Sequence, residues 1–378
     1  MGNPLLVILS RGDGEGSLVT QPSRILRSFG VSAPQDDDGQ RGFSLIEMTV
    51  TLAIVSVLMI AVYAMIEQTI RATLFNESHS DLAVLSQKAV NGVQGELLQT
   101  RMVFQEDALG SSYRGALQLS SRYPVASDSL LPVFDIATVI NPDTNTRFTG
   151  NSLLIVRQLE PLSITYDHDN NGSTPEIEFL ADLYRFEYIY LSQSSTPNFS
   201  GSGRSLDLVQ STSIDYADYF QLSAMGSTAI RSIATKLIAR GLSRAWDPGQ
   251  PLTSSFYTLS GATDGTFDAA LSNPVPRIDL ARAKTLMPGL RGGHIGGKMV
   301  YSVAFNPASL ASPYPLRIPI RVFAIADPNR PNFPSGFEVK VAGPSGSRQV
   351  MTRVVLMSNY VGGRYESQQG FAITAGRF

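Results

Sequence analysis

A long uncharged apolar run lies near the N-terminal end of the chain. Residues 48–66 read MTVTLAIVSVLMIAVYAMI, nineteen residues without a charge, a glycine or a proline. The hydrocarbon core of a bilayer takes about 20 apolar residues in a helix. A core helix of a globular domain is usually shorter, and polar residues interrupt its apolar face. We therefore predict a transmembrane helix over residues 43–66.

The hydrophobic pattern changes after residue 66, where apolar residues return mostly at steps of three and four with polar residues between them. This spacing predicts an amphipathic continuation of the helix over residues 67–102, with one face packed on a globular part. A periplasmic coiled-coil stalk is the competing interpretation, but the heptad is not sustained. The apolar positions are Ile70, Leu74, Leu82, Leu85, Ala89, Val93 and Leu97.

From about residue 103 the pattern predicts short strands, rich in β-branched and aromatic residues and bounded by Gly, Pro, Asn and Ser. A helix is predicted over residues 227–245 with Ser227 as its N-cap, and residues from about 200 to 297, loop-rich after Trp246, are expected to form an insertion. The predicted fold is α+β, a long N-terminal helix packed on an antiparallel sheet head of residues 103–378. The candidate strands are Ala116–Leu119, Ser152–Gln158, Leu162–Tyr166, Ile177–Leu191, Met299–Phe305, Arg317–Ala326 and Gln349–Leu356.

Composition removes several functional classes. The chain of 378 residues has no cysteine, which excludes disulfides, thiolate metal sites and cysteine nucleophiles. Its formal net charge of -2 gives no attraction to nucleic acid. Only three histidines occur, His79, His168 and His294, and they are far apart in sequence. A histidine metal cluster or a catalytic triad is therefore not expected, and no enzyme activity is predicted.

The residues before the apolar run carry one acidic side chain. The string reads Arg41-Gly42-Phe43-Ser44-Leu45-Ile46-Glu47. A carboxylate inside the apolar part of a membrane costs roughly 3 kcal/mol, so such a group usually has a partner. Glu47 could instead lie at headgroup level, or favour the positive end of its own helix dipole. Neither alternative explains the residues that precede it.

The segment Gly42 to Ile66 resembles the processing site of type IV prepilins and pseudopilins. In that family a glycine precedes the cut, an aromatic residue becomes the new N-terminus, and the fifth mature residue is glutamate. The resemblance implies cleavage between Gly42 and Phe43 by a prepilin peptidase, which also methylates the Phe43 amine. It also implies that Glu47 pairs with the N-terminal amine of a neighbouring subunit, because opposite charges in an apolar bundle strongly favour contact.

The same resemblance implies location and partners. Residues 1–42 correspond to a leader, unusually long for this family, in which we expect no stable fold before Gln40. The mature chain is expected in the inner membrane with its head in the periplasm, and then in a pilus or pseudopilus. Its expected partners are the peptidase, other pilin subunits and the inner-membrane assembly platform. The large size, the hairpin from Ile164 to Tyr190 and the strand MTRVVLMSNY favour a minor pilin over the major subunit.

The turn between two predicted strands has the spacing of a calcium-binding loop. Residues 167–178 read DHDNNGSTPEIE and fit D-x-[DN]-x-[DN]-G-x5-E. Calcium sites also occur in some pseudopilins. The competing interpretation is a solvated Asn-Gly turn, because predicted strands flank the loop where an EF-hand has helices. Calcium is the one cofactor that the sequence suggests. The candidate ligands are Asp167, Asp169, Asn171, Ser173 and Glu178.

A glycine-rich segment, GGHIGGK at residues 292–298, comes close to a P-loop. Met299 stands where a P-loop has Ser or Thr, and a strand is predicted where a helix is required, so we reject nucleotide binding. Two functions are carried forward. One is a minor pilin or pseudopilin that acts in filament assembly. The other is a single-pass membrane protein whose head binds a ligand or hydrolyses a substrate, with a chance prepilin-like string.

Overall fold

The structure of the chain is a computed structural model, and it divides into two compact units, residues 1–63 and residues 64–378. Helix α1 (Leu45–Leu97) is continuous through the boundary between them. The residues that the structure describes are 43–125, 129–135, 150–168, 172, 175–193, 206–259, 271–272, 277–287, 301–303, 337–344, 346–360 and 364–376.

Helix α1 changes character along its length. Its large apolar side chains are exposed up to Ile66, whereas Leu82, Val90 and Val93 are fully buried. The helix ends at Leu97 and does not reach the predicted residue 102, because the chain turns there into strand β1 (Thr100–Val103), which pairs with strand β4 (Leu153–Gln158). The first part of the helix therefore exposes its apolar side chains, and the second part buries its apolar side chains in the core of the head.

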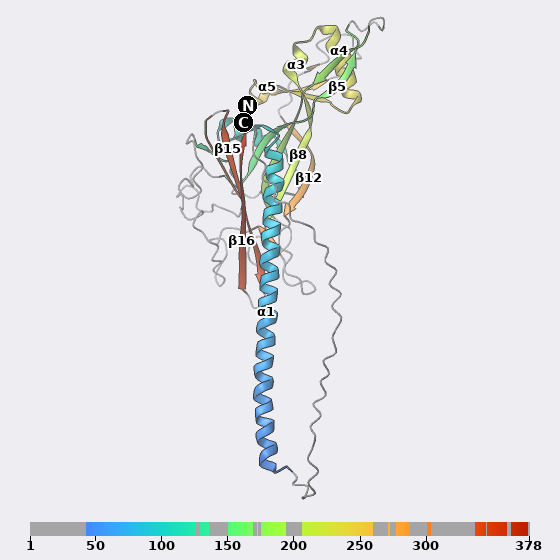
Figure 1. The fold of residues 1–378 in the computed structure, drawn as a ribbon. Helices are drawn as coiled ribbons and strands as arrows, with labels where there is room; N and C mark the ends of the chain where they lie inside the picture. The colour runs from blue at the N-terminus through green and yellow to red at the C-terminus, as the bar shows by residue number, and fades with distance from the viewer. Residues whose placement is uncertain are drawn as a thin grey trace, which may run out of the picture. The chain divides into compact units, whose positions relative to one another are not determined.

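The head is built on one large, mainly antiparallel sheet (Figure 1). Its path runs β1-β4-β7-β8-β13-β15-β14-β3, and strand β16 (Arg364–Gly376) pairs with β15 along the whole length of that strand. The pairs β12–β2, β14–β3 and β8–β9 are parallel. The remaining bounds are β2 (Leu117–Gln118), β3 (Phe134–Asp135), β7 (Leu183–Gln193), β8 (Leu206–Asp218), β9 (Arg244–Trp246), β10 (Phe256–Leu259), β11 (Leu271–Ser272), β12 (Ile278–Met287), β13 (Tyr301–Val303), β14 (Phe337–Ala342) and β15 (Arg348–Tyr360).

A smaller layer is formed by the two-stranded sheet of β5 (Leu162–Tyr166) and β6 (Ile177–Ala181), on which helix α4 (Ser227–Ala239) packs. Ile164 and Phe179 from the strands meet Ile230, Ile233 and Leu237 from the helix in one buried cluster. The short helices are α2 (Ala108–Gly115), α3 (Tyr219–Ser223) and α5 (Leu252–Ser255).

The α+β class with its long N-terminal helix is confirmed, and several details of the prediction are wrong. The predicted strand 177–191 is two strands, β6 and β7, which belong to different sheets. Helix α4 ends at Ala239, because residues 244–246 pair as β9, and its N-cap is Gly226 instead of Ser227. Residues 206–218 are not part of an insertion, since β8 lies in the middle of the large sheet. The predicted strand Arg317–Ala326 falls outside the described residues.

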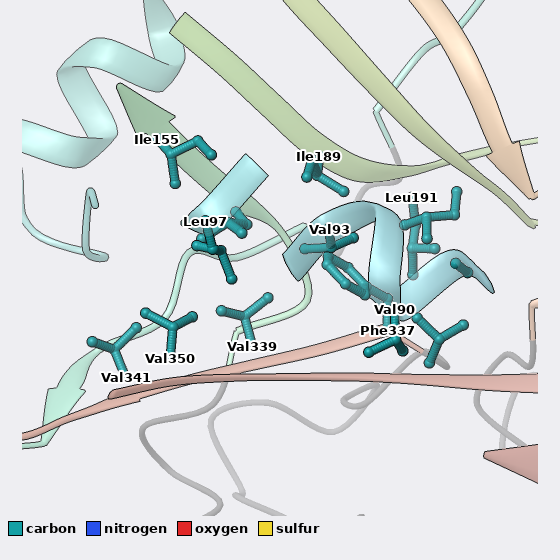
Figure 2. Close-up of a cluster of buried hydrophobic side chains, with 14 of the residues drawn as sticks. Val90, Val93, Leu97, Ile155, Ile189, Leu191, Phe337, Val339, Val341 and Val350 are labelled. Carbon is teal, nitrogen blue, oxygen red and sulfur yellow. The ribbon is translucent and has the colours of Figure 1, made fainter. Parts of the chain in front are cut away.

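The main core lies between helix α1 and the large sheet. Figure 2 shows Val90, Val93 and Leu97 of α1 between two sets of apolar side chains. On one side lie Ile155, Ile189 and Leu191, and on the other lie Val339 and Val341 of β14 and Val350 of β15. All of these side chains are buried. Burying an aliphatic side chain of this size contributes about 1.5–3 kcal/mol. The amphipathic half of α1 is therefore held by the head through apolar contact.

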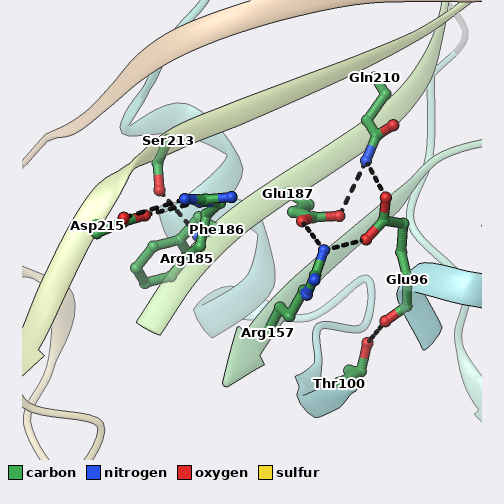
Figure 3. A network of polar contacts seen from close by, with 9 residues as sticks. All are labelled: Glu96, Thr100, Arg157, Arg185, Phe186, Glu187, Gln210, Ser213 and Asp215. Carbon is green, nitrogen blue, oxygen red and sulfur yellow. Dashed lines mark hydrogen bonds and ion pairs between the residues drawn. The ribbon is translucent and has the colours of Figure 1, made fainter. Parts of the chain in front are cut away.

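A polar network joins the same end of α1 to the sheet (Figure 3). Arg157 of β4 forms an ion pair with Glu96 of α1, and its Nη1 lies 3.5 Å from Oε1 of Glu187 on β7. Gln210 of β8 donates to Glu187 at 3.0 Å and to Glu96 at 3.3 Å. Burial and the neighbouring Glu96 raise the pKa of Glu187, against the influence of Arg157. The ion pair and hydrogen bonds of this network are directional, unlike the apolar contacts of the core, so they orient the C-terminal end of α1 on the sheet.

Candidate functional site: the start of the long helix

The first turn of helix α1 is closed by a reciprocal pair of hydrogen bonds. The Ser44 backbone N–H donates to Oε2 of Glu47 at 3.0 Å, and the Glu47 backbone N–H donates to the Ser44 hydroxyl at 3.2 Å. This is a capping box, in which each side chain satisfies an amide that has no partner inside the helix. Glu47 therefore supports its own helix start, in addition to its negative charge near the positive end of the dipole.

The helix that follows presents an apolar surface all round. Phe43 is 81% exposed and Leu52 69% exposed, and the large apolar residues from Leu45 to Ile66 are likewise exposed. Among the described residues, α1 is the one helix long and apolar enough to cross a membrane. Exposing so much contiguous apolar surface to water is unfavourable, so this surface fits lipid or other helices.

The serine and threonine hydroxyls within the apolar part of α1 are hydrogen-bonded inside the helix. Thr49 donates to the Leu45 carbonyl at 2.8 Å, and Thr51 donates to the Glu47 carbonyl at 2.7 Å. Ser56 donates to the carbonyl of Leu52 at 2.7 Å. A polar group in an apolar medium costs free energy unless it is hydrogen-bonded. These bonds let the helix enter lipid or a helical bundle without an unsatisfied serine or threonine donor.

The predicted processing residues are only partly described. Phe43 and Glu47 lie at the exposed start of α1, whereas Gly42, on the other side of the predicted cut, lies outside the described residues. Sequence reasoning singled out Glu47 but missed the role of Ser44. The pattern S-x-x-E directly before an apolar run could have revealed it.

The predicted calcium loop is also only partly described. Asp169, Asn171 and Ser173 lie outside the described residues. Oδ2 of Asp167 accepts the Gly172 N–H at 2.6 Å, with Gly172 at a φ of 72°. The described ligand at the other end, Glu178, accepts a hydrogen bond from the Ser163 hydroxyl at 2.6 Å. Strands β5 and β6 flank the loop, and no group of three acidic or histidine side chains occurs among the described residues. Calcium binding stays a prediction.

The remaining candidates from the sequence take no part in a described site. The glycine-rich segment 292–298, with His294, falls outside the described residues. His168 lies 6.5 Å from the ring of Tyr166, and His79 stacks on Phe75 with 6.3 Å between ring centroids.

One comparison with known proteins finds a match, and it falls on the start of the long helix. The family model described as the prokaryotic N-terminal methylation motif matches residues 38–63. No curated protein and no solved structure matches the chain. The match covers the residues before the predicted cut, the capping box and most of the exposed apolar part of α1.

Proposed function

We propose that this chain, whose residues 38–63 match the prokaryotic N-terminal methylation motif, is a type IV pilin-like or pseudopilin-like protein and acts as a minor subunit of a type IV pilus or type II secretion pseudopilus. The observation that carries the proposal is the exposed apolar helix that begins at Leu45, with Ser44 and Glu47 forming the capping box at its start. In this proposal the protein acts by assembly and not by catalysis, and its head lies in the periplasm.

Processing is the first step of the proposed function. Cleavage between Gly42 and Phe43 releases the leader and creates an amine on Phe43, which is then methylated. The helix from Phe43 to Ile66 anchors the chain in the inner membrane before assembly. It then leaves the lipid for the helical core of the filament, where its apolar surface contacts other subunits.

Glu47 has two tasks in this proposal. Its Oε2 accepts the Ser44 N–H within the chain, and a carboxylate has further lone pairs for another donor. The methylated amine of a neighbouring subunit can therefore bind the same side chain without opening the capping box. A charge pair of this kind in an apolar bundle sets the axial register of the incoming subunit.

The size of the head supports a priming or tip position. The described residues after 103 form a large sheet with a second layer, and a repeating shaft offers less space around each subunit than a filament end does. Contacts with the assembly platform and with other pilins are expected through α1, as they are for the family.

The test is mass spectrometry of the mature N-terminus, using the full chain purified from a host with and without a prepilin peptidase. The proposal expects a chain that begins at N-methylated Phe43 only when the peptidase is present. A Gly42→Val variant should keep the leader, because a side chain before the cut is expected to clash in the peptidase site, whereas a Gly2→Val variant should be processed normally. An intact leader or a cut at another bond favours the alternative, a membrane-anchored ligand-binding or hydrolytic protein.

A further inference from the structure

An open cleft of about 440 Å³ lies in the head where the small β5–β6 layer meets the large sheet. Its walls come from five elements: β5, β7, β8, β12 and the end of α4. Ligand sites prefer such junctions and have volumes of roughly 300–1,000 Å³. The cleft lies wholly within the unit of residues 64–378 and is separate from the start of helix α1.

Irregular strand pairing shapes the floor of the cleft. The register of β7 on β8 shifts between Arg185 and Glu187, and the register of β12 on β8 shifts between Leu280 and Arg282. Both irregularities fall within residues 212–215 of β8. Bulges re-aim side chains and are common next to binding sites. Here two of them lie side by side, and the re-aimed residues line the same cleft.

The charge of the lining is positive. Arg185, Arg240 and Arg282 line the cleft together with a single carboxylate, Asp215. Asp215 accepts two hydrogen bonds from Arg185, at 2.7 Å from Nε and 3.0 Å from Nη2 (Figure 3). A guanidinium has five N–H donors, so three donors of Arg185 are left for a ligand. Asp215 therefore fixes the orientation of the Arg185 guanidinium, and three of its five N–H donors remain for a ligand.

The other two arginines are exposed, and no carboxylate within the described ranges forms an ion pair with either of them. Arg240 is the C-cap residue that follows helix α4. The nearby helix carbonyls of Ile238 and Leu237 accept from the N–H groups of Gly241 at 2.8 Å and Leu242 at 3.0 Å. Arg282 extends from the bulged part of β12. Nearby charged residues outside the lining have partners of their own. Arg244 forms an ion pair with Asp279 at 2.6 Å. Glu187 and Glu96 contact Arg157 and Gln210.

Aliphatic side chains complete the lining, from Leu162, Leu183, Ile214 and Leu242. A site with an apolar body and a few fixed charges binds an organic ligand whose carbon skeleton contacts the apolar part. Guanidinium groups match planar carboxylates and phosphates, which they bind through paired, charge-assisted hydrogen bonds. We propose that this cleft binds a small organic acid, whose oxyanion contacts Arg240, Arg282 and the free donors of Arg185, and whose carbon body contacts the leucines.

The proposal can be tested with the full chain in a neutral detergent at fixed ionic strength. Isothermal titration calorimetry with isophthalate, an aromatic dicarboxylate, should show binding, and the neutral isophthalamide should show none. The double variant Arg240→Gln/Arg282→Gln should lose about tenfold or more in affinity, because it removes two of the charged donors that would bind the oxyanion. Arg122→Gln is the matched control, because this exposed arginine lies over the Tyr123 ring outside the cleft, and its affinity should equal that of the wild type.

A second variant separates recognition from damage to the fold. Asp215→Asn removes the one carboxylate of the lining and keeps an oxygen acceptor for Arg185, so its affinity for isophthalate should increase. Absence of isophthalate binding to the wild type, equal binding of the amide, or equal affinity of the double variant and Arg122→Gln would each overturn the proposal. None of these outcomes bears on processing at Phe43, so the proposed function is tested separately.

Discussion

Glu47 combines a local and an intermolecular role in one side chain, and the capping box allows the two to be separated. Its carboxylate accepts the Ser44 N–H, and its backbone N–H is satisfied by the Ser44 hydroxyl. Glutamine serves in a capping box as glutamate does. Charge, by contrast, is required for pairing with an amine of another subunit. Substitutions at these two positions therefore distinguish helix capping from assembly.

Three variants follow from this separation. Glu47→Gln keeps the cap but should abolish filament entry, because the attraction to the neighbouring amine is lost. Ser44→Ala should retain assembly, although it weakens the helix start by about 1 kcal/mol. Glu47→Ala should lose both. The measurements are the yield of the protein in sheared filament fractions and helix content by circular dichroism. Normal filament yield with Glu47→Gln would show that the charge is dispensable.

The predicted calcium loop also gives a test at the level of single residues. Calorimetry of the full chain should show calcium binding that is lost in Asp169→Ala, because a hard cation depends on each carboxylate oxygen. The matched control is Asp81→Ala, which removes a carboxylate on helix α1, outside the loop. A wild type that gives no calcium-dependent heat would contradict the calcium hypothesis for residues 167–178.

At the level of elements, helix α1 and strand β16 come unusually close. A Cβ added to Gly370 would lie 2.8 Å from the backbone carbonyl oxygen of Ser86 on α1. Atoms of the backbone cannot move aside as a flexible side chain can, so any larger residue separates strand and helix. Gly95, later in the same helix, has nothing within 4 Å of the added atom. The close contact with α1 therefore requires glycine at position 370, whereas packing does not require glycine at position 95.

This contrast makes a prediction with its own control. Gly370→Ala should destabilise the head by about 1–3 kcal/mol, since it overpacks the contact with α1. Gly95→Ala should stabilise it by roughly 0.5–1 kcal/mol, because alanine restricts the unfolded chain and favours the helix. Urea unfolding followed by circular dichroism measures both. A neutral Gly370→Ala would mean that α1 and β16 separate at little cost.

At the scale of the whole molecule, the buried carboxyl of Glu338 should make a large contribution to how stability depends on pH. Glu338 of β14 is 1% exposed, and its Oε2 lies 3.6 Å from Nη1 of Arg353 on β15. Burial raises the pKa of Glu338 to about 7, against the opposing influence of Arg353 and Lys340. The folded state then binds this proton more tightly than the unfolded state, whose pKa lies near 4.5.

The sign of the effect follows from linkage. Between about pH 4.5 and pH 7 the folded protein holds more protons, so the free energy of unfolding falls as the pH rises. Glu338→Gln should reduce this slope, to which the raised pKa of Glu187 contributes in the same direction. The variant should be more stable than the wild type above about pH 8, on the order of 1–3 kcal/mol. Thermal unfolding across this pH range measures it, with the exposed Glu160→Gln as control. An unchanged slope in Glu338→Gln would assign the titration to another group.

The local features of this protein could be read from residue order alone, because they depend on near neighbours in the chain. An uncharged run of nineteen residues makes a helix apolar on every side wherever it lies, and a serine three residues before a glutamate caps it. Strands β4 and β5 were predicted almost to the residue, since the apolar run of β4, the alternation of β5 and the flanking turn residues are also local.

Tertiary structure decided everything that depends on residues distant in sequence. The strand predicted over 177–191 divides at Asp182 because β6 pairs with β5 while β7 pairs with β4 and β8. The sequence placed β8 in an expected insertion and did not predict the strand, because its position in the sheet is set by its partners β7, β12 and β13. The arginines of the cleft are separated by many residues of chain, and only the meeting of three strands with the end of α4 brings their charges to one site.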